Sequence, residues 1–155
     1  MESPPCSCGR RACCVCIIVI ICVGIPLVLG CRRSRPVRVP VSGHVRIDGK
    51  PLTFGSITLV PSNGRPSSGA IDGQGHFALT CYEGEDGALI GKHAVRIIAA
   101  KPISEEATKW FIPKKYANQR TSGLEVAIDG PTDSLEINLT WDGGAPFVEK
   151  SGAGH

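Results

Sequence analysis

The chain has 155 residues and a formal net charge of +3 at pH 7, and its basic residues are unevenly distributed. This length suits one domain preceded by an anchoring segment. Residues 32–38 carry four arginines and no acid, whereas residues 41–142 carry ten Lys and Arg against twelve Asp and Glu. Because nucleic-acid binding requires basic charge gathered on a folded face, this distribution argues against a nucleic-acid partner. It favours contact of the arginines with anionic lipid headgroups.

Seven of the eight cysteines lie within the first 31 residues, and Cys81 is the only one that follows. Residues 41–142 therefore have no second cysteine with which to form an internal disulfide, and we expect a hydrophobic core to stabilise them. The N-terminal cysteines lack the repeated C-x-x-C spacing of zinc sites and run directly into isoleucines. We interpret them as small apolar residues, with acylation beside a membrane as an alternative. The sequence predicts no metal and no cofactor.

Residues 1–30 have the pattern of a membrane-targeting segment. Arg10 and Arg11 precede the apolar run ACCVCIIVIICVGIPLVLG, and Gly30 stands immediately before Cys31. A charged region, an apolar region and a small residue in this order are typical of a signal peptide. The arrangement resembles the lipobox of bacterial lipoproteins. That resemblance implies that residues 1–30 are removed and that Cys31 carries the lipid.

The alternative is an uncleaved transmembrane helix. The run from residue 12 to residue 30 has nearly the length of about twenty residues that a spanning helix needs. More arginines follow the run than precede it, so an uncut helix would leave the body in the cytoplasm by the positive-inside rule. We favour the lipoprotein interpretation, with the body on the extracytoplasmic side. Both interpretations attach the protein to a membrane, with residues 31–40 as an Arg- and Pro-rich tether.

From residue 41 onward the apolar residues recur with a period of two, which is typical of strands with one buried face. Turn residues, including Asp-Gly pairs at 48–49 and 72–73, separate the apolar segments. Six or seven such strands predict an all-β sandwich over residues 41–142, followed by a flexible tail at 143–155. The alternating segments are VSGHVRI, SITLVP, GHFALT, HAVRIIA, LEVAID and SLEINLT.

The order of these segments resembles a known family. The succession VSGHVRIDGKPLTFGSITLVP, GAIDGQGHFALT, YEGEDGALIGKHAVRI and IPKKYANQRTSGLEVAI is similar to the transthyretin-like, carboxypeptidase-regulatory-like domain of bacterial surface lipoproteins. The resemblance implies a seven-stranded prealbumin-like sandwich, exported and without a catalytic role. His93 departs from the family pattern, in which an aromatic residue is common at this position. By strand alternation we expect His93 to point inward.

The transthyretin fold also includes hydrolases of 5-hydroxyisourate, which share paired histidines, an arginine and a C-terminal Tyr-Arg-Gly-Ser tail. This chain ends in VEKSGAGH and lacks that tail. No histidine adjoins another in the sequence, Cys81 has no neighbouring base, and no G-x-S-x-G, H-E-x-x-H or P-loop motif occurs. The sequence therefore predicts no enzyme and no catalytic residue.

The connection from residue 101 to residue 123 is longer than the four to six residues that are usual for loops. We expect SEEATKW to form a short helix capped by Ser104. Long loops are often functional, and aromatic and basic residues gather here. Alternatively, the three aromatic side chains fold back over the open end of the sandwich. The candidate binding residues are Trp110, Phe111, Lys114, Lys115 and Tyr116.

These observations predict a membrane-anchored, non-enzymatic β-sandwich module for interaction or structure at the cell envelope. Its expected partner, besides the membrane, is an envelope protein or polysaccharide. The alternative is a lipoprotein that binds a small ligand such as a sugar or a metabolite, and a third candidate is a transthyretin-fold hydrolase.

Overall fold

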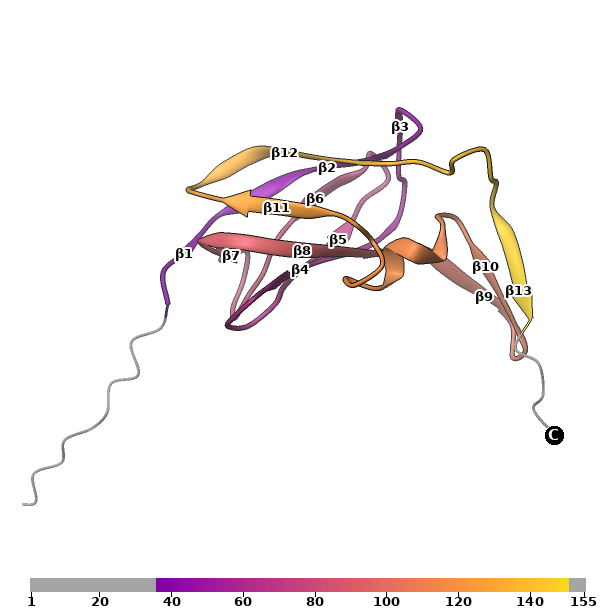
Figure 1. Ribbon diagram of the computed structural model, residues 1–155, viewed down its shortest axis with the longest axis horizontal. Coiled ribbons are helices and arrows are strands. Elements are labelled where there is room, and N and C mark those ends of the chain that lie inside the picture. The colour runs from indigo at the N-terminus through magenta and orange to yellow at the C-terminus, as the bar shows by residue number, and fades with distance from the viewer. Residues whose placement is uncertain (1–35, 151–155) are drawn as a thin grey trace, which may run out of the picture. The chain divides into compact units, whose positions relative to one another are not determined.

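The computed structural model describes residues 36–150 (Figure 1). The predicted signal peptide or anchor and Cys31 lie outside the described residues. The strands are β1 (Arg38–Val39), β2 (Val41–Ile47), β3 (Lys50–Pro51), β4 (Gly55–Pro61), β5 (Ser67–Ile71), β6 (His76–Ala78), β7 (Ala88–Leu89), β8 (Gly91–Ile98), β9 (Ala100–Ser104), β10 (Ala107–Trp110), β11 (Glu125–Ile128), β12 (Thr132–Leu139) and β13 (Phe147–Lys150). Among the described residues, the helical element is the 3₁₀ helix η1 (Lys114–Ala117).

The main sheet has the strand order β11-β8-β4-β5-β6-β2-β12, and β3 pairs with β2. All neighbours are antiparallel except β2 and β12, which are parallel. The sheet curls into a half-barrel, so that β12 and β2 lie on one side of the interior and β8 and β4 on the other (Figure 1). The predicted all-β class, with sandwich-like packing, is confirmed. No helix within residues 36–150 is long and apolar enough to cross a membrane.

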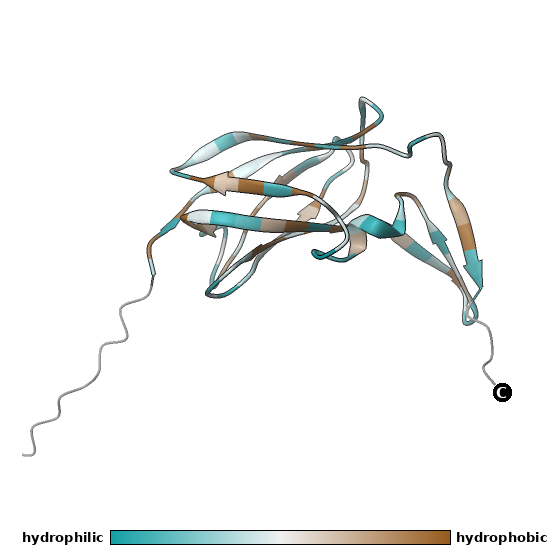
Figure 2. Ribbon diagram, in the orientation of Figure 1, coloured by the Kyte–Doolittle hydropathy of each residue, from teal (hydrophilic) through white to brown (hydrophobic). Residues whose placement is uncertain are grey.

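The interior contains the residues that strand alternation predicted. Apolar and polar residues alternate along β8 and β11, as the colours in Figure 2 show. Burying a large apolar side chain completely contributes roughly 1.5–3 kcal/mol, and these side chains form one continuous core. The predicted inward residues that are buried are Val41, Val45, Ile57, Leu59, Phe77, Leu79, Val95, Ile97, Ile128, Ile137 and Leu139.

Both predicted Asp-Gly turns are present. Asp48 and Gly49 have φ values of 48° and 78° and connect β2 to β3 as a two-residue hairpin. Positive φ at both central residues is the requirement of the type I′ turn, whose twist matches that of the strands. The second turn connects β5 to β6, and its left-handed residue is Gly75, with φ 81°.

The strands β2 and β12 approach each other unusually closely at Gly43. Gly43 is aligned with Leu135, next to an irregularity in the register of the parallel pair. A Cβ atom at position 43 would overlap the carbonyl oxygen of Leu135. Only a residue without a side chain fits there, because the obstacle is backbone that cannot rotate away.

The expected helix at residues 104–110 is wrong. Ser104 ends β9, the next two residues turn, and β10 begins at Ala107, so the segment is an antiparallel hairpin. A helix of one or two turns is marginal by itself. The hairpin instead gains a third strand, because β13 pairs with β10 along its whole length.

The folded body extends beyond the predicted boundaries at both ends. Residues 147–150 form β13, which corrects the prediction of a flexible tail for this part of residues 143–155. At the other end, Arg38 and Val39 of the predicted tether pair with β7, and the Val39 side chain is buried. Both additions are short strands whose partners lie far away in the sequence.

Candidate functional site

The five predicted binding residues lie at one end of the sheet, between the end of β10 and η1. Trp110 ends β10, Phe111 follows it, and the other three belong to η1. The structure therefore brings them close together, but it directs them to different neighbours. Four of them contact the C-terminal segment, residues 140–150, and the fifth lines a groove.

Tyr116 belongs to the core. Its side chain is 4% exposed. The Tyr116 hydroxyl donates a hydrogen bond to the Thr140 carbonyl at 3.3 Å and accepts one from the Thr140 N–H at 3.2 Å. Tyr116 therefore fits the alternative interpretation, in which the aromatic side chains fold back over the open end of the sandwich.

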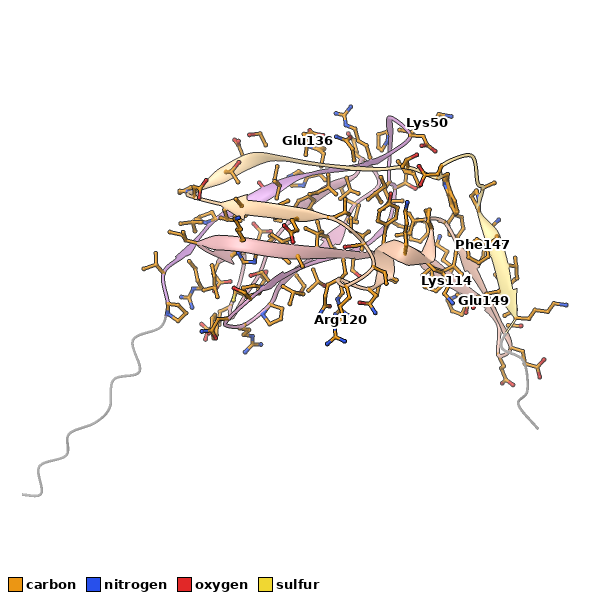
Figure 3. All side chains as sticks on the ribbon, in the orientation of Figure 1. Lys50, Lys114, Arg120, Glu136, Phe147 and Glu149 are labelled. Atoms are coloured by element: carbon orange, nitrogen blue, oxygen red, sulfur yellow. The ribbon has the colours of Figure 1, made fainter. Side chains whose placement is uncertain are left out.

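Trp110 and Lys114 both bind Glu149 on β13. The indole N–H of Trp110 donates to Glu149 Oε2 at 3.0 Å, and Lys114 Nζ donates to Oε1 at 2.6 Å. These two hydrogen bonds, that of Lys114 having the larger effect, hold the pKa of the Glu149 carboxyl below its ordinary value. Figure 3 shows the Lys114 and Glu149 side chains meeting beside β13.

Lys115 makes a similar contact with the loop before β13. Its Nζ lies 2.6 Å from Asp142 Oδ2. The shared hydrogen bond is the main cause that raises the pKa of Lys115 and lowers the pKa of Asp142. Both groups are exposed, so water screens the attraction and the pair chiefly orients the segment.

Phe111 lines a groove that we call the aromatic groove. Its ring packs edge-to-face against Phe54, with centroids 4.8 Å apart, and Trp141 also lines the groove. The Trp141 backbone N–H donates to Asp48 Oδ1 at 3.3 Å, which joins Trp141 to the β2–β3 turn. The groove has a volume of about 380 Å³ and is lined by Ile47, Asp48, Lys50, Pro51, Leu52, Thr53, Phe54, Phe111, Trp141 and Pro146.

Lysines surround the aromatic groove. Lys101 Nζ lies 4.3 Å from the centre of the Phe54 ring, and Lys109 Nζ lies 5.2 Å from the centre of the Phe111 ring. Such cation–π contacts are attractive but leave the charge uncompensated. Within residues 36–150, no carboxylate forms an ion pair with Lys50, Lys101 or Lys109. The groove therefore combines apolar rings and the Asp48 carboxylate with three nearby lysines that form no ion pair within residues 36–150.

Comparisons of the chain with protein-family models, with curated proteins and with solved structures found no match. The resemblance to the transthyretin-like domain therefore rests on the order of the segments in the sequence.

Sequence reasoning did not select Phe54, Trp141 or Asp48. Phe54 stands between two predicted strands and Trp141 directly follows another, so each was an aromatic residue at the end of the sandwich. Their position at the end of the predicted sandwich was the signal that could have identified them. Their shared location depends on the pairing of β2 with both β3 and β12, which no local pattern reveals.

Two further residues singled out in the sequence are buried. His93 points inward as predicted, with 1% exposure and its Nε2 2.8 Å from the Leu89 carbonyl oxygen. Cys81 is 4% exposed, and its thiol lies 3.7 Å from the Arg65 carbonyl oxygen. Both side chains are thus held among core neighbours and away from the aromatic groove.

The acidic loop after β6 is organised around Asp86. Its Oδ1 accepts hydrogen bonds from the backbone N–H groups of Cys81, at 2.6 Å, and Tyr82, at 3.2 Å. The bond from Cys81 is the largest cause of the lowered pKa of Asp86. Asp86 also forms an ion pair with Arg38 on β1 at 3.2 Å. The Asp86 carboxylate therefore links this loop to Arg38, at the end of the predicted tether.

Proposed function

We propose that the protein is a membrane-anchored, non-enzymatic β-sandwich module that binds a partner at the cell envelope through the aromatic groove. One observation carries this proposal: three aromatic rings line a groove beside lysines that have no carboxylate partner among the described residues. Aromatic side chains supply large contact areas at interfaces, and uncompensated charge attracts and orients a partner of opposite sign.

The partner that fits this chemistry is an acidic segment of an envelope protein. An apolar side chain of the segment would enter between Phe54, Phe111 and Trp141, while its carboxylates would meet Lys50 and Lys101. The neighbouring strand β9 adds an unpaired edge among the described residues. An extended segment can add to such an edge, although Pro102 removes one donor from it.

Attachment to the membrane is supported by the sequence of the N-terminal segment. The apolar run of residues 12–30 and the Gly30–Cys31 pair resemble a lipoprotein signal, and lipidation at Cys31 would hold the body on the extracytoplasmic side. For the fold we propose the seven-stranded prealbumin-like sandwich. The seven strands along the main path of the sheet support this proposal.

The test is capture of envelope proteins by the solubilised full chain at low and high salt. We expect the double variant Lys50→Glu, Lys101→Glu to lose the partner, and Trp141→Ala to weaken its capture. The matched control is Lys92→Glu, which reverses an exposed charge on β8, away from the groove lining. Equal capture by the double variant and the control would contradict the proposal, as would capture that is insensitive to salt.

A small acidic ligand is the second candidate, because the groove volume lies within the usual range of about 300–1,000 Å³ for ligand pockets. The two candidates differ in their sensitivity to protease. If an acidic oligosaccharide or metabolite occupies the groove, protease-treated envelope extract still supplies the ligand. If an acidic protein segment occupies it, protease treatment removes the captured species.

A further inference from the structure

The outer face of the main sheet brings together two histidines that are far apart in the sequence. His44 on β2 and His76 on β6 are directly opposite each other in the antiparallel register. Their ring centroids are 5.3 Å apart and their planes meet at 68°. The side chains are 40% and 44% exposed, so solvent reaches both rings.

Carboxylates flank this pair on both sides. Glu136 on β12 is aligned with His44 in the parallel register, and its Oε1 lies 3.8 Å from His44 Nδ1. Asp72, in the β5–β6 turn, has its Oδ2 3.9 Å from His76 Nδ1. Glu136, His44 and His76 thus form one row across three adjacent strands. Figure 3 shows Glu136 on the outer side of the sheet.

This arrangement has the chemistry of a transition-metal chelate. Imidazole nitrogen suits Zn²⁺, Cu²⁺ and Ni²⁺, and a metal-bound histidine usually directs its other ring N–H toward a carboxylate or a carbonyl. Here each Nδ1 atom lies within 4 Å of a carboxylate oxygen, just beyond hydrogen-bond length, so Nε2 is the ring nitrogen that remains for an ion in each histidine.

The spacing of the rings matches a shared ion. A metal about 2.05 Å from a ring nitrogen lies roughly 3.2 Å from the ring centre, and two such rings on a tetrahedral ion have centroids about 5.2 Å apart. The observed separation is 5.3 Å. The two strands therefore hold the ring centroids at the separation that one shared ion requires.

The surrounding charges favour a cation on balance. The Asp72 carboxylate is held in place beside the pair, since its Oδ1 accepts hydrogen bonds from the backbone N–H groups of Gln74 and His76. Arg46 opposes a cation, because its Nε lies 3.3 Å from Glu136 Oε2 and compensates part of that charge. The charged groups around the two rings are thus two carboxylates and one guanidinium, so their net charge is negative.

We propose that His44 and His76 chelate one divalent transition-metal ion, of the zinc or copper type, through their Nε2 atoms, with water completing the coordination. Glu136 and Asp72 act as positioning residues that orient the two rings. Within residues 36–150, no group of three or more His, Cys, Asp or Glu side chains is arranged as a metal centre. The ion therefore has two protein donors and keeps exchangeable positions. This site is independent of the aromatic groove.

The test uses the full chain in detergent micelles, titrated with Zn²⁺ by calorimetry at neutral pH. The cysteine thiols are alkylated first, because thiolates bind zinc and would compete with the histidines. We expect one equivalent of Zn²⁺ to bind. His44→Ala and His76→Ala should each lower the affinity by about tenfold or more, since losing even an outer-shell partner commonly costs 10–100-fold.

The matched control is Arg46→Gln, which keeps both imidazoles and removes the opposing charge. It should bind Zn²⁺ as tightly as the wild type, or more tightly. Unchanged affinity in the double variant His44→Ala, His76→Ala would overturn the proposal, and so would loss of binding in Arg46→Gln.

A second measurement needs only the wild-type chain. Substoichiometric Cu²⁺ should broaden the ring-proton NMR signals of His44 and His76, whereas the signals of His93, which is buried in the core, stay sharp. Zn²⁺ should also raise the thermal midpoint, because an ion that binds only the paired strands stabilises the folded state. Sharp signals from all three histidines would overturn the proposal.

Discussion

Trp110 donates its indole hydrogen bond to Glu149, 39 residues further along the chain. Four of the five side chains that the sequence marked for recognition make contacts of this kind with residues 140–150 of the same chain. Their aromatic and basic character suits a peptide segment, and the segment they hold is the protein's own. The neighbouring aromatic groove, which we propose as the site for a different molecule, shares only Phe111 with the predicted set.

The contacts of Glu149 predict a pH dependence for the docking of β13. Its pKa is lowered from an ordinary value of 4.5. A carboxyl with a lowered pKa stabilises the folded state fully above its ordinary pKa, and that stabilisation is lost as the pH falls through the lowered value. We therefore expect the contact between β10 and β13 to weaken as the pH falls below 4.5.

Trp110 fluorescence in a Trp141→Phe background reports this weakening. The matched variant Glu149→Gln removes the titrating group, so its β13 should dock more weakly at neutral pH and lose this acid transition. An acid transition that is identical in Glu149→Gln would contradict the assignment.

Gly43 and Gly73 form a matched pair of alanine substitutions. At Gly43 the new methyl group would meet the Leu135 carbonyl oxygen, whereas at Gly73 nothing lies within 4 Å and the backbone is not left-handed. We expect Gly43→Ala to destabilise the domain by about 3 kcal/mol or more, at or above the usual range for overpacking. Gly73→Ala should change stability by at most about 0.5 kcal/mol. Urea denaturation curves of the two variants provide the comparison, and similar midpoints would show that β2 and β12 do not approach as described.

Tyr116→Phe tests the link between η1 and the end of β12. The substitution keeps the buried ring and removes the hydroxyl that both donates to and accepts from the Thr140 backbone. Leaving two part-buried backbone groups without this partner should cost about 1–2 kcal/mol of unfolding free energy. Hydrogen exchange should show the loss as faster exchange of the Thr140 amide, and unchanged exchange there would argue against the contact.

Cys31→Ser tests the membrane attachment. In a bacterial host, metabolic labelling with a palmitate analogue should mark the wild-type chain, because the Gly30–Cys31 pair follows an apolar run as in lipoprotein signals. The variant should lose the label and retain residues 1–30. A full-length, unlabelled wild-type protein would instead support the uncleaved helix.

Strand alternation predicted the core well, because a strand with one buried face shows its pattern locally. Val45, Ile57 and Val95 are buried where their neighbours suggested. Alternation cannot reveal which strands are neighbours, since pairing depends on residues far apart. The β9–β10–β13 sheet, the grouping of Phe54 with Trp141, and the meeting of His44 with His76 all depend on such pairing. For that reason the sequence identified Phe111 but missed the rest of the groove.

The parallel pairing of β2 with β12 has a consequence for how the chain folds. It joins residues 41–47 to residues 132–139, so the sheet cannot be completed before residue 139 has emerged from the ribosome. Pairings between such distant segments are slow to form, because the entropy of closing a long loop must be lost before any contact is gained. Throughout synthesis, therefore, β2 lacks its final neighbour β12, while its antiparallel pairing with β6 needs only residues up to 78.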